Sequence, residues 1–225
     1  RLSVPLRYGE IHPRTILGDI ARRDGAGRFV DELCWREFYA DVLLHNPASA
    51  WNDLTGAIER ISYDDPDPEL FGAWQEGRTG FPFVDAGMRQ LLAEGWMHNR
   101  VRMVTASFLT KDLHVWWPHG ARHFLDRLID GDIASNNHGW QWVAGTGTDA
   151  SPYFRVFNPV TQGLKFDPAG DYVRRWVPEL RHLEGKAAHE PWKHPGGYDH
   201  AYPRQIVDHG HARAEALARY ELARA

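Results

Sequence analysis

The chain contains little cysteine, no long apolar run and no large excess of one charge. Its one cysteine, Cys34, has no second thiol for an internal disulfide and cannot hold an iron–sulfur cluster alone, so we expect a reducing compartment, the cytoplasm. No stretch approaches the roughly 18 consecutive apolar residues of a membrane span. Residues Arg1 to Pro5 also lack the basic-then-apolar start of a secretion signal. These absences exclude a disulfide scaffold and predict no membrane partner.

The charge balance does not advertise a polyanionic partner. The chain has 26 Lys and Arg against 30 Asp and Glu, a net charge of −4 over 225 residues. Any nucleic acid must therefore bind at a local basic patch on an acidic whole. The chain starts at Arg1 rather than Met, which indicates a piece of a longer protein.

The chain is rich in tryptophan, with ten residues, and its apolar residues follow helical periodicity. Most buried indoles only pack, so a tryptophan-rich core is the plain explanation. Apolar residues recur at helical spacing and no alternating strands are evident, so we predict an all-α fold in one domain, residues 1–225. The expected helices cover 15–21, 29–44, 83–93, 98–113, 121–129 and 207–222. Asp132 is expected to cap a further helix.

The helix over 29–44 has an unusual polar face. Glu32, Trp35, Arg36 and Tyr39 lie at i, i+3, i+4 and i+7 and therefore share one side of the helix. A Glu–Arg pair beside a packed Trp would explain this face plainly. Alternatively, the face is the wall of a site for a flat polar ligand, which the indole would stack on and the charged groups would bind.

A second polar face lies on the helix over 98–113. Asn99, Arg102 and Met103 share it, whereas Arg100 points elsewhere. A buried arginine needs an acid or a phosphate, and Asp130 is the candidate acid for Arg102. An amide such as that of Asn99 can both donate to and accept from the edge of a planar heterocycle.

The third segment runs from Asp130 to Trp142 and offers no convincing metal site. Asp130 and Asp132 lack the spacing and closing Glu of a calcium loop, and the pair His119 and His123 has no third ligand, so we predict no metal. Trp140 and Trp142 are two residues apart on an expected helix. They should therefore point to nearly opposite sides and serve different compartments.

Together these segments resemble the photolyase/cryptochrome family in its flavin-binding domain. The matching runs are residues 35–39, 95–100, 130–132, 136–142, 146–155 and 157–159. The resemblance covers nearly the whole chain in order. It implies an all-helical domain that binds FAD, and an N-terminal α/β domain with a folate or deazaflavin antenna chromophore that this chain does not include.

The resemblance also implies roles at the cofactor. The residues implied to bind FAD are Ser3, Glu32, Arg36, Asn99, Arg102, Asp130, Asp132 and Asn136. Ser3 would be the remnant of a phosphate-binding loop, Arg102 and Asp130 an ion pair beside the flavin, and Asn136 the residue facing flavin N5. Glu32 and Asn136 are the implied catalytic residues, and Glu32 would also hydrogen-bond the damaged pyrimidines.

The implied partner is DNA containing pyrimidine dimers, bound by a monomer. Residues implied to bind the DNA or its lesion are Trp35, Arg36, Tyr39, Asn99, Arg100, Met103, Trp142 and Arg155. Trp35 and Trp142 would be the two aromatic walls of the lesion pocket. Arg100, Arg155 and Lys165 are the candidates for phosphate contacts at its rim.

Trp140 and Trp117 are implied to transfer electrons to the flavin. Asp64 stands where relatives can have a third, outer Trp. Tyr63 or Trp74 could take its place, and the sequence leaves both open.

Four positions imply light-dependent repair of cyclobutane pyrimidine dimers, in the class I branch of the family. Asn99 and Met103 replace the histidine pair of six-four enzymes, Asn136 replaces the Asp of plant-type cryptochromes, and Trp142 replaces the Tyr of single-strand-preferring relatives. The alternatives are a flavin photoreceptor without repair activity and a cofactor-free aromatic nucleic-acid binder.

Overall fold

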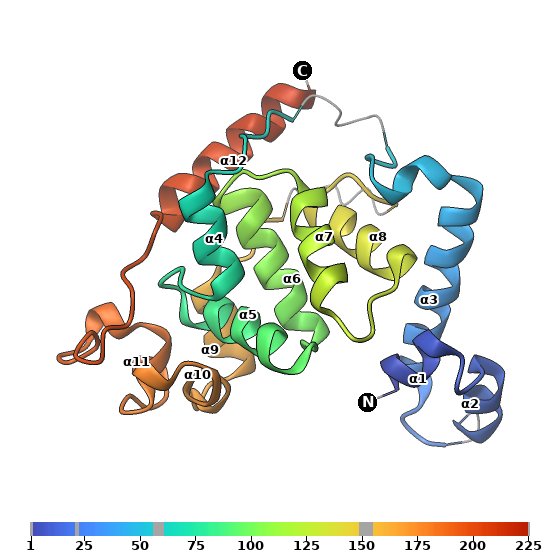
Figure 1. Ribbon diagram of the computed structural model, residues 1–225, viewed down its shortest axis with the longest axis horizontal. Coiled ribbons are helices and arrows are strands. Elements are labelled where there is room, and N and C mark those ends of the chain that lie inside the picture. The colour runs from blue at the N-terminus through green and yellow to red at the C-terminus, as the bar shows by residue number, and fades with distance from the viewer. Residues whose placement is uncertain (1, 21–22, 56–60, 149–154, 225) are drawn as a thin grey trace.

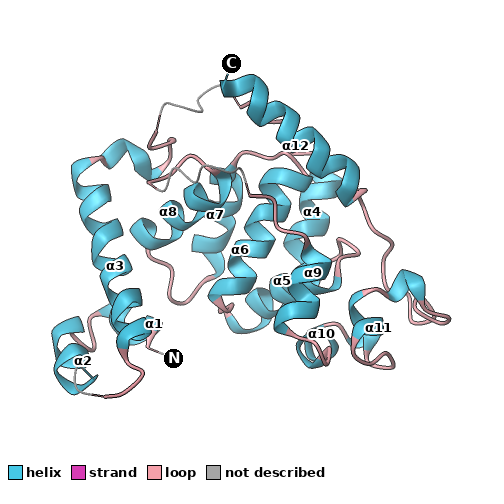
Figure 2. Ribbon diagram, turned by 180° about the vertical axis from the view of Figure 1, so that it is seen from behind, coloured by secondary structure: helices cyan, strands magenta, loops and turns pink. Residues whose placement is uncertain are grey.

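The fold was determined as a computed structural model that describes residues 2–20, 23–55, 61–148 and 155–224. In this described part every regular element is a helix, and the one β-type contact is an isolated bridge between Asp64 and Val115. Figures 1 and 2 show the same helical assembly from two opposite sides. The prediction of an all-α fold is confirmed. None of the described helices is long and apolar enough to cross a membrane.

The helices follow one another along the chain with short connections. The α-helices are α1 (Ser3–Tyr8), α2 (Pro13–Ile20), α3 (Gly27–His45), α4 (Pro68–Glu76), α5 (Pro82–Glu94), α6 (Asn99–Ser107), α7 (Trp117–Arg127), α8 (Ile133–Ala144), α9 (Pro159–Phe166), α10 (Asp171–Trp176), α11 (Lys186–His189) and α12 (His209–Arg224). Short 3₁₀ turns are η1 (Pro47–Ala50), η4 (Pro178–Leu180) and η5 (Pro191–Lys193), and η3 (Phe108–Asp112) is a π-helical turn.

Helix α6 lies at the centre, with α5 on one side and α7 and α8 on the other (Figures 1 and 2). The core around it contains the fully buried side chains of Trp74, Phe108 and Trp117. Leu6, Ile16 and Leu33 form a separate small cluster that joins α1, α2 and α3. Much of the tryptophan excess is therefore core packing, as the plain explanation expected.

The predicted helix starts differ from the observed ones by one to four residues, and two of these differences have simple reasons. Helix α7 begins at Trp117 rather than at 121. Pro118 falls in its first turn, where a backbone N–H has no partner within the helix, so the N–H that proline lacks is not missed. Helix α12 begins at His209 rather than at 207, because the Asp208 carboxylate accepts from His211 N at 2.7 Å and acts as the cap.

The long helix expected over 98–113 is two elements. The His98 side chain accepts from Arg100 N, so α6 starts after His98. From Phe108 the backbone widens into a π turn, in which Leu113 N donates to Phe108 O at 3.0 Å. Such turns are rare and frequently lie at functional sites. Apolar periodicity does not distinguish a π turn from an α-helix, so the sequence pattern missed it.

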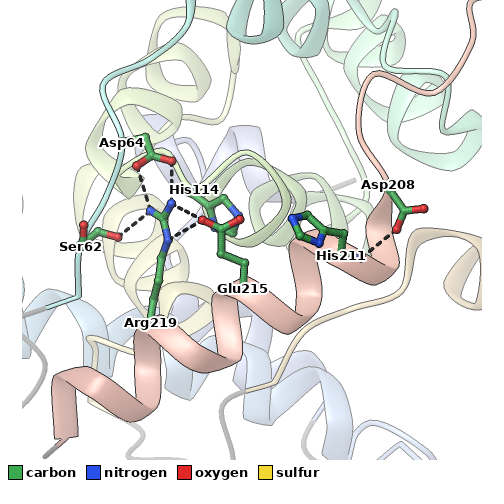
Figure 3. Close-up of polar contacts among 7 residues, drawn as sticks. All are labelled: Ser62, Asp64, His114, Asp208, His211, Glu215 and Arg219. Carbon is green, nitrogen blue, oxygen red and sulfur yellow. Dashed lines mark hydrogen bonds and ion pairs between the residues drawn. The ribbon is translucent and has the colours of Figure 1, made fainter.

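The C-terminal helix α12 is fastened to the body by a charged cluster that Figure 3 shows. Arg219 donates to both oxygens of Asp64, at 3.0 and 2.9 Å, and to Ser62 O at 3.0 Å. Glu215 pairs with Arg219 on the same helix and lies 3.5 Å from His114 Nε2. The carboxylate at position 64 thus has a structural role in docking α12.

Candidate functional site

A cavity of about 470 Å³ lies between α3, α6, α7 and α8, within the usual size range of cofactor sites. Its lining residues are Glu32, Trp35, Arg36, Tyr39, Asn99, Arg102, Met103, Ala106, Phe124, Leu128, Asp130, Gly131, Asp132, Ser135, Asn136, Gly139, Trp140, Trp142 and Val143. Three segments far apart in sequence, each predicted to contain site residues, therefore meet at one cavity. Nine lining residues are aromatic or otherwise apolar, and eight are polar or charged and could orient a bound molecule.

Helix α3 forms one wall, and its predicted face is the one that borders the cavity. Glu32, Trp35, Arg36 and Tyr39 all line it. The Trp35 ring is 48% exposed and stacks on Tyr39 with centroids 5.7 Å apart, so a broad aromatic surface faces the opening. Arg36 pairs with Glu37, not with Glu32 as the plain explanation expected. This leaves the Glu32 carboxylate outside that ion pair.

Polar contacts from α8 hold this wall in place. The Tyr39 ring stacks on His138, with centroids 5.5 Å apart and planes 5° from parallel. Gln141 donates to Ser49 O at 2.8 Å and accepts from Leu54 N at 2.8 Å, which ties the chain after α3 to α8. His138 and Gln141 are buried and hydrogen-bonded, so they fix the wall in one position.

Helix α6 contributes the cavity's ion pair. Arg102 Nη2 donates to Asp130 Oδ1 at 3.0 Å and Oδ2 at 2.9 Å, and its Nε donates to Met97 O at 2.8 Å. Asp130 is buried, so the predicted pair is confirmed and places a hydrogen-bonded charge pair at the cavity edge. One turn earlier, Asn99 Nδ2 lies 4.0 Å from Met103 Sδ. All of these side chains but Met97 line the cavity.

Helix α8 and its cap contribute further polar groups to the cavity. Asp132 accepts from Ser135 N at 2.9 Å and caps the helix as predicted. The Asn136 amide donates to Ala121 O at 3.1 Å and to Asn137 Oδ1 at 2.8 Å. Because both amide hydrogens are used on the protein, the carbonyl oxygen of Asn136 is the atom that can accept from a ligand.

Trp140 and Trp142 both line the cavity, although their surroundings differ. Trp140 is 3% exposed and meets Phe124 edge-on at 4.9 Å. Trp142 is half-buried, and the Arg155 guanidinium lies 5.9 Å from its ring. The two indoles therefore border one cavity, one from the core and one from the rim, rather than separate compartments.

Five predicted residues lie outside the lining, and one of them is Lys165, whose Nζ lies 5.5 Å from the Phe166 ring. Ser3 is exposed on α1, Arg100 lies 4.7 Å from the Phe166 ring, and Arg155 is exposed. Trp117 is buried, and its Nε1 donates to Asp53 at 2.6 Å. Residues 149–154, the middle of the matched run 146–155, lie outside the described residues.

The aromatic neighbours of Trp140 include one that the sequence left open. The Trp74 ring lies 6.1 Å from Trp140, whereas the ring contact of Trp117 is with Trp116 at 6.4 Å. Asp64, for which the resemblance implied an outer Trp in relatives, is paired with Arg219. The Trp140–Trp117 path stays a prediction.

Sequence reasoning missed the apolar and small lining residues. These are Ala106, Phe124, Leu128, Gly131, Ser135, Gly139 and Val143. Gly139 lies one turn from Asn136, Val143 one turn from Trp140 and Ser135 two turns from Trp142, so helical spacing could have found them. Phe124 lies on α7 and Leu128 directly follows that helix. No cavity-lining residue was predicted in this region, and only the fold brings these two to the cavity. Within the described residues no three His, Cys, Asp or Glu side chains gather as a metal site would require.

Residues 29–222 match the family model described as the FAD binding domain of DNA photolyase. The chain belongs to the DNA photolyase family. Two photolyase relatives named deoxyribodipyrimidine photo-lyase come from Escherichia coli K12, 50% identical over 240 residues, and Streptomyces griseus, 51% identical over 230 residues. Each alignment covers 100% of this chain but only 49% and 48% of the relative.

Solved structures of a photolyase and a cryptochrome share the fold. A bacterial class III photolyase from Agrobacterium tumefaciens superposes with a TM-score of 0.90 at 47% identity, covering 99% of this chain and 49% of that one. A cryptochrome from Synechocystis gives a TM-score of 0.90 at 33% identity, covering 97% and 48%. This chain spans about half the length of the photolyase relatives it matches.

Proposed function

We propose that the protein repairs cyclobutane pyrimidine dimers in DNA by light-driven electron transfer, with FAD bound in the cavity between α3, α6, α7 and α8. The observation that carries this proposal is that accessible indoles and hydrogen-bonding polar groups line the same cavity. An exposed indole, Trp35, and a half-buried one, Trp142, border it together with the Arg102–Asp130 pair and Asn136. Membership of the photolyase family supports the assignment.

The residues present fit a flavin. FAD has flat ring systems that need apolar walls, and hydrogen-bonding edges that need a few placed polar groups. Phe124, Leu128 and Trp140 supply buried apolar and aromatic surface. Asn136 supplies its side-chain oxygen as an acceptor, while its amide hydrogens bond the protein. The Arg102–Asp130 pair supplies charge of both signs. When bound, FAD would supply the light-driven electron transfer that splits the dimer.

The chain's own residues would hold the lesion and exclude water. Trp35 and Trp142 would stack on the flipped-out pyrimidines, and Glu32 would accept hydrogen bonds from them. Met103 and Asn99 would border the same space. Arg100, Arg155 and Lys165 would bind phosphates without reading sequence. Flipping is cheaper at a damaged pair, which favours the lesion over normal DNA.

Repair is favoured over signalling by the relatives and by the walls. The photolyase relatives are about 50% identical to this chain, whereas the cryptochrome from Synechocystis is 33% identical. Both candidate lesion walls, Trp35 and Trp142, border the cavity. We place the enzyme in the cytoplasm as a monomer, with its antenna chromophore in an α/β domain outside this chain.

The test is repair under light by the full-length protein. We expect flavin absorption in the purified protein, and loss of thymine dimers from DNA under blue or near-UV light but not in the dark. Dimers that stay intact after illumination of fully reduced, flavin-loaded protein would contradict repair. A colourless protein would contradict flavin binding and favour the cofactor-free alternative.

A further inference from the structure

The segment over 155–158 is fastened to one face of the α6–η3 helix. Lys111 Nζ donates to Arg155 O at 2.6 Å, and Phe157 N donates to Ser107 Oγ at 3.2 Å. Ser107 and Lys111 are four residues apart, so their side chains point the same way from the central helix. The next residue, Asn158, caps α9 by accepting from Thr161 N. Two hydrogen bonds therefore hold the backbone of this segment at Arg155 and Phe157, and the Asn158 side chain joins it to α9.

Lys111 is an unusual residue for the inside of a protein. Its side chain is 2% exposed and lies in the π turn η3. Burial, and then the nearby charge of Arg155, lower the pKa of Lys111 to about 7, while Asp112 opposes this. A buried ammonium is unfavourable unless it is hydrogen-bonded. Packing alone would be served better by an apolar side chain of similar length, such as Met.

The same segment presents a cation at the cavity rim. The Arg155 side chain is exposed, and its guanidinium lies 5.9 Å from the ring of Trp142, which lines the cavity. An arginine over an indole is attracted to the ring face. The direction of the Arg155 side chain depends on where the Arg155 backbone is held. Lys111 binds that backbone from the core.

We propose that Lys111 is a positioning residue for damaged-DNA binding, which holds the Arg155 backbone so that the Arg155 guanidinium stays over Trp142 at the rim of the cavity. This inference rests on the proposed function, because it assumes that Arg155 and Trp142 contact the DNA. Lys111 itself, buried beneath the segment, would touch neither DNA nor cofactor.

The test uses the full-length, flavin-loaded protein and a duplex with one thymine dimer. Lys111→Met should raise the Kd for this duplex about tenfold, which corresponds to loss of roughly one well-placed contact. Repair per absorbed photon at saturating DNA should stay unchanged, as should flavin content. Thr110→Val is the matched control, because Thr110 is buried in the same turn and its hydroxyl bonds within the helix to Ala106 O. It should leave the Kd within about twofold.

A double-mutant cycle separates positioning from general loosening. If Lys111 acts through Arg155, adding Lys111→Met to Arg155→Ala should change the Kd by less than about twofold. Multiplying effects of the two substitutions, or an unchanged Kd in Lys111→Met alone, would overturn the proposal. If Lys111→Met loses its flavin or unfolds, Ser107→Ala takes its place in the cycle, because it removes the bond that holds the same segment at Phe157. Its Kd should rise, with no further rise in the Arg155→Ala background.

Failure of the proposed function gives a different result. Wild-type protein that neither prefers the damaged duplex nor repairs it contradicts the function before any variant is compared. Wild-type protein that repairs normally, with independent effects of Lys111→Met and Arg155→Ala, contradicts only the positioning role.

Discussion

Trp35 and Trp140 border the same cavity from opposite extremes of exposure, 48% and 3%. Trp35 is open to a large ligand such as DNA, whereas Trp140 is enclosed by Phe124 and Trp74. We therefore expect Trp35→Ala to weaken binding of dimer-containing DNA by about 10- to 100-fold, since base–aromatic stacking is worth about 1–3 kcal/mol. Flavin content should be retained. Gel-shift titration and flavin absorbance check both parts.

Trp140→Phe should behave in the opposite way. It keeps an aromatic ring in the core and removes the more easily oxidised indole, so photoreduction of oxidised flavin should slow at least tenfold, an order-of-magnitude expectation from the change in cofactor surroundings. Repair by protein that was reduced beforehand should persist. Transient absorption and a repair assay on the two starting states measure this. Equal behaviour of the Trp35 and Trp140 variants in both assays would contradict the separate roles.

His123 links stability to pH. Burial, and further the charge of Arg127, lower the pKa of His123 to about 4. The folded state therefore holds the neutral ring, while the unfolded chain takes up a proton near pH 6.5. The stabilisation is present above pH 6.5 and is lost as the pH falls towards 4, by on the order of 2 kcal/mol. His123→Gln, which can still bond Gln75, should flatten this part of the curve. Urea unfolding between pH 4 and 7 measures it, and equal slopes would exclude His123 as the cause.

At the scale of elements, α7 packs closely against α8 at a glycine. A Cβ at Gly120 would lie 2.2 Å from Trp140 Cη2 and 2.5 Å from Leu109 Cδ2, so neighbouring side chains would have to move. Gly120→Ala should lower the free energy of unfolding by about 1–3 kcal/mol and shift Trp140, the cavity's inner wall.

Gly72→Ala is the control for this substitution. Gly72 lies inside α4, and a Cβ there meets nothing within 4 Å. The gain in helix propensity should raise the free energy of unfolding by about 0.5–1 kcal/mol. Denaturant titration of both variants checks the contrast. A Gly120→Ala variant as stable as wild type would show that α7 and α8 can separate without loss.

For the whole molecule, the net charge of −4 requires that DNA binding come from a local patch. Arg100 and Lys165 lie 4.7 and 5.5 Å from the same ring, that of Phe166, and so form one basic group outside the cavity. Replacing Arg100 with Gln should weaken damaged and undamaged DNA binding alike. It should also reduce the slope of log Kd against log salt by about 1. Titrations from 50 to 200 mM salt test this, and an unchanged slope would remove Arg100 from the phosphate contacts.

The sequence by itself determined the features that repeat locally. The all-α class, the shared face of Glu32, Trp35, Arg36 and Tyr39, and the cap at Asp132 follow from helical spacing and side-chain chemistry, and the structure bears them out. The Arg102–Asp130 pair was also predictable, although the two residues lie 28 positions apart, because a buried arginine needs an acid and Asp130 was the candidate.

The tertiary structure alone decided the contacts between distant segments. The stacking of Tyr39 on His138, the Arg219–Asp64 pair and the bond from Lys111 to the Arg155 carbonyl join residues 99, 155 and 44 positions apart. No local pattern marks such partners, since an apolar period shows which face is buried but not what covers it. The same limit hid the π turn, and with it the burial of Lys111 that underlies our further inference.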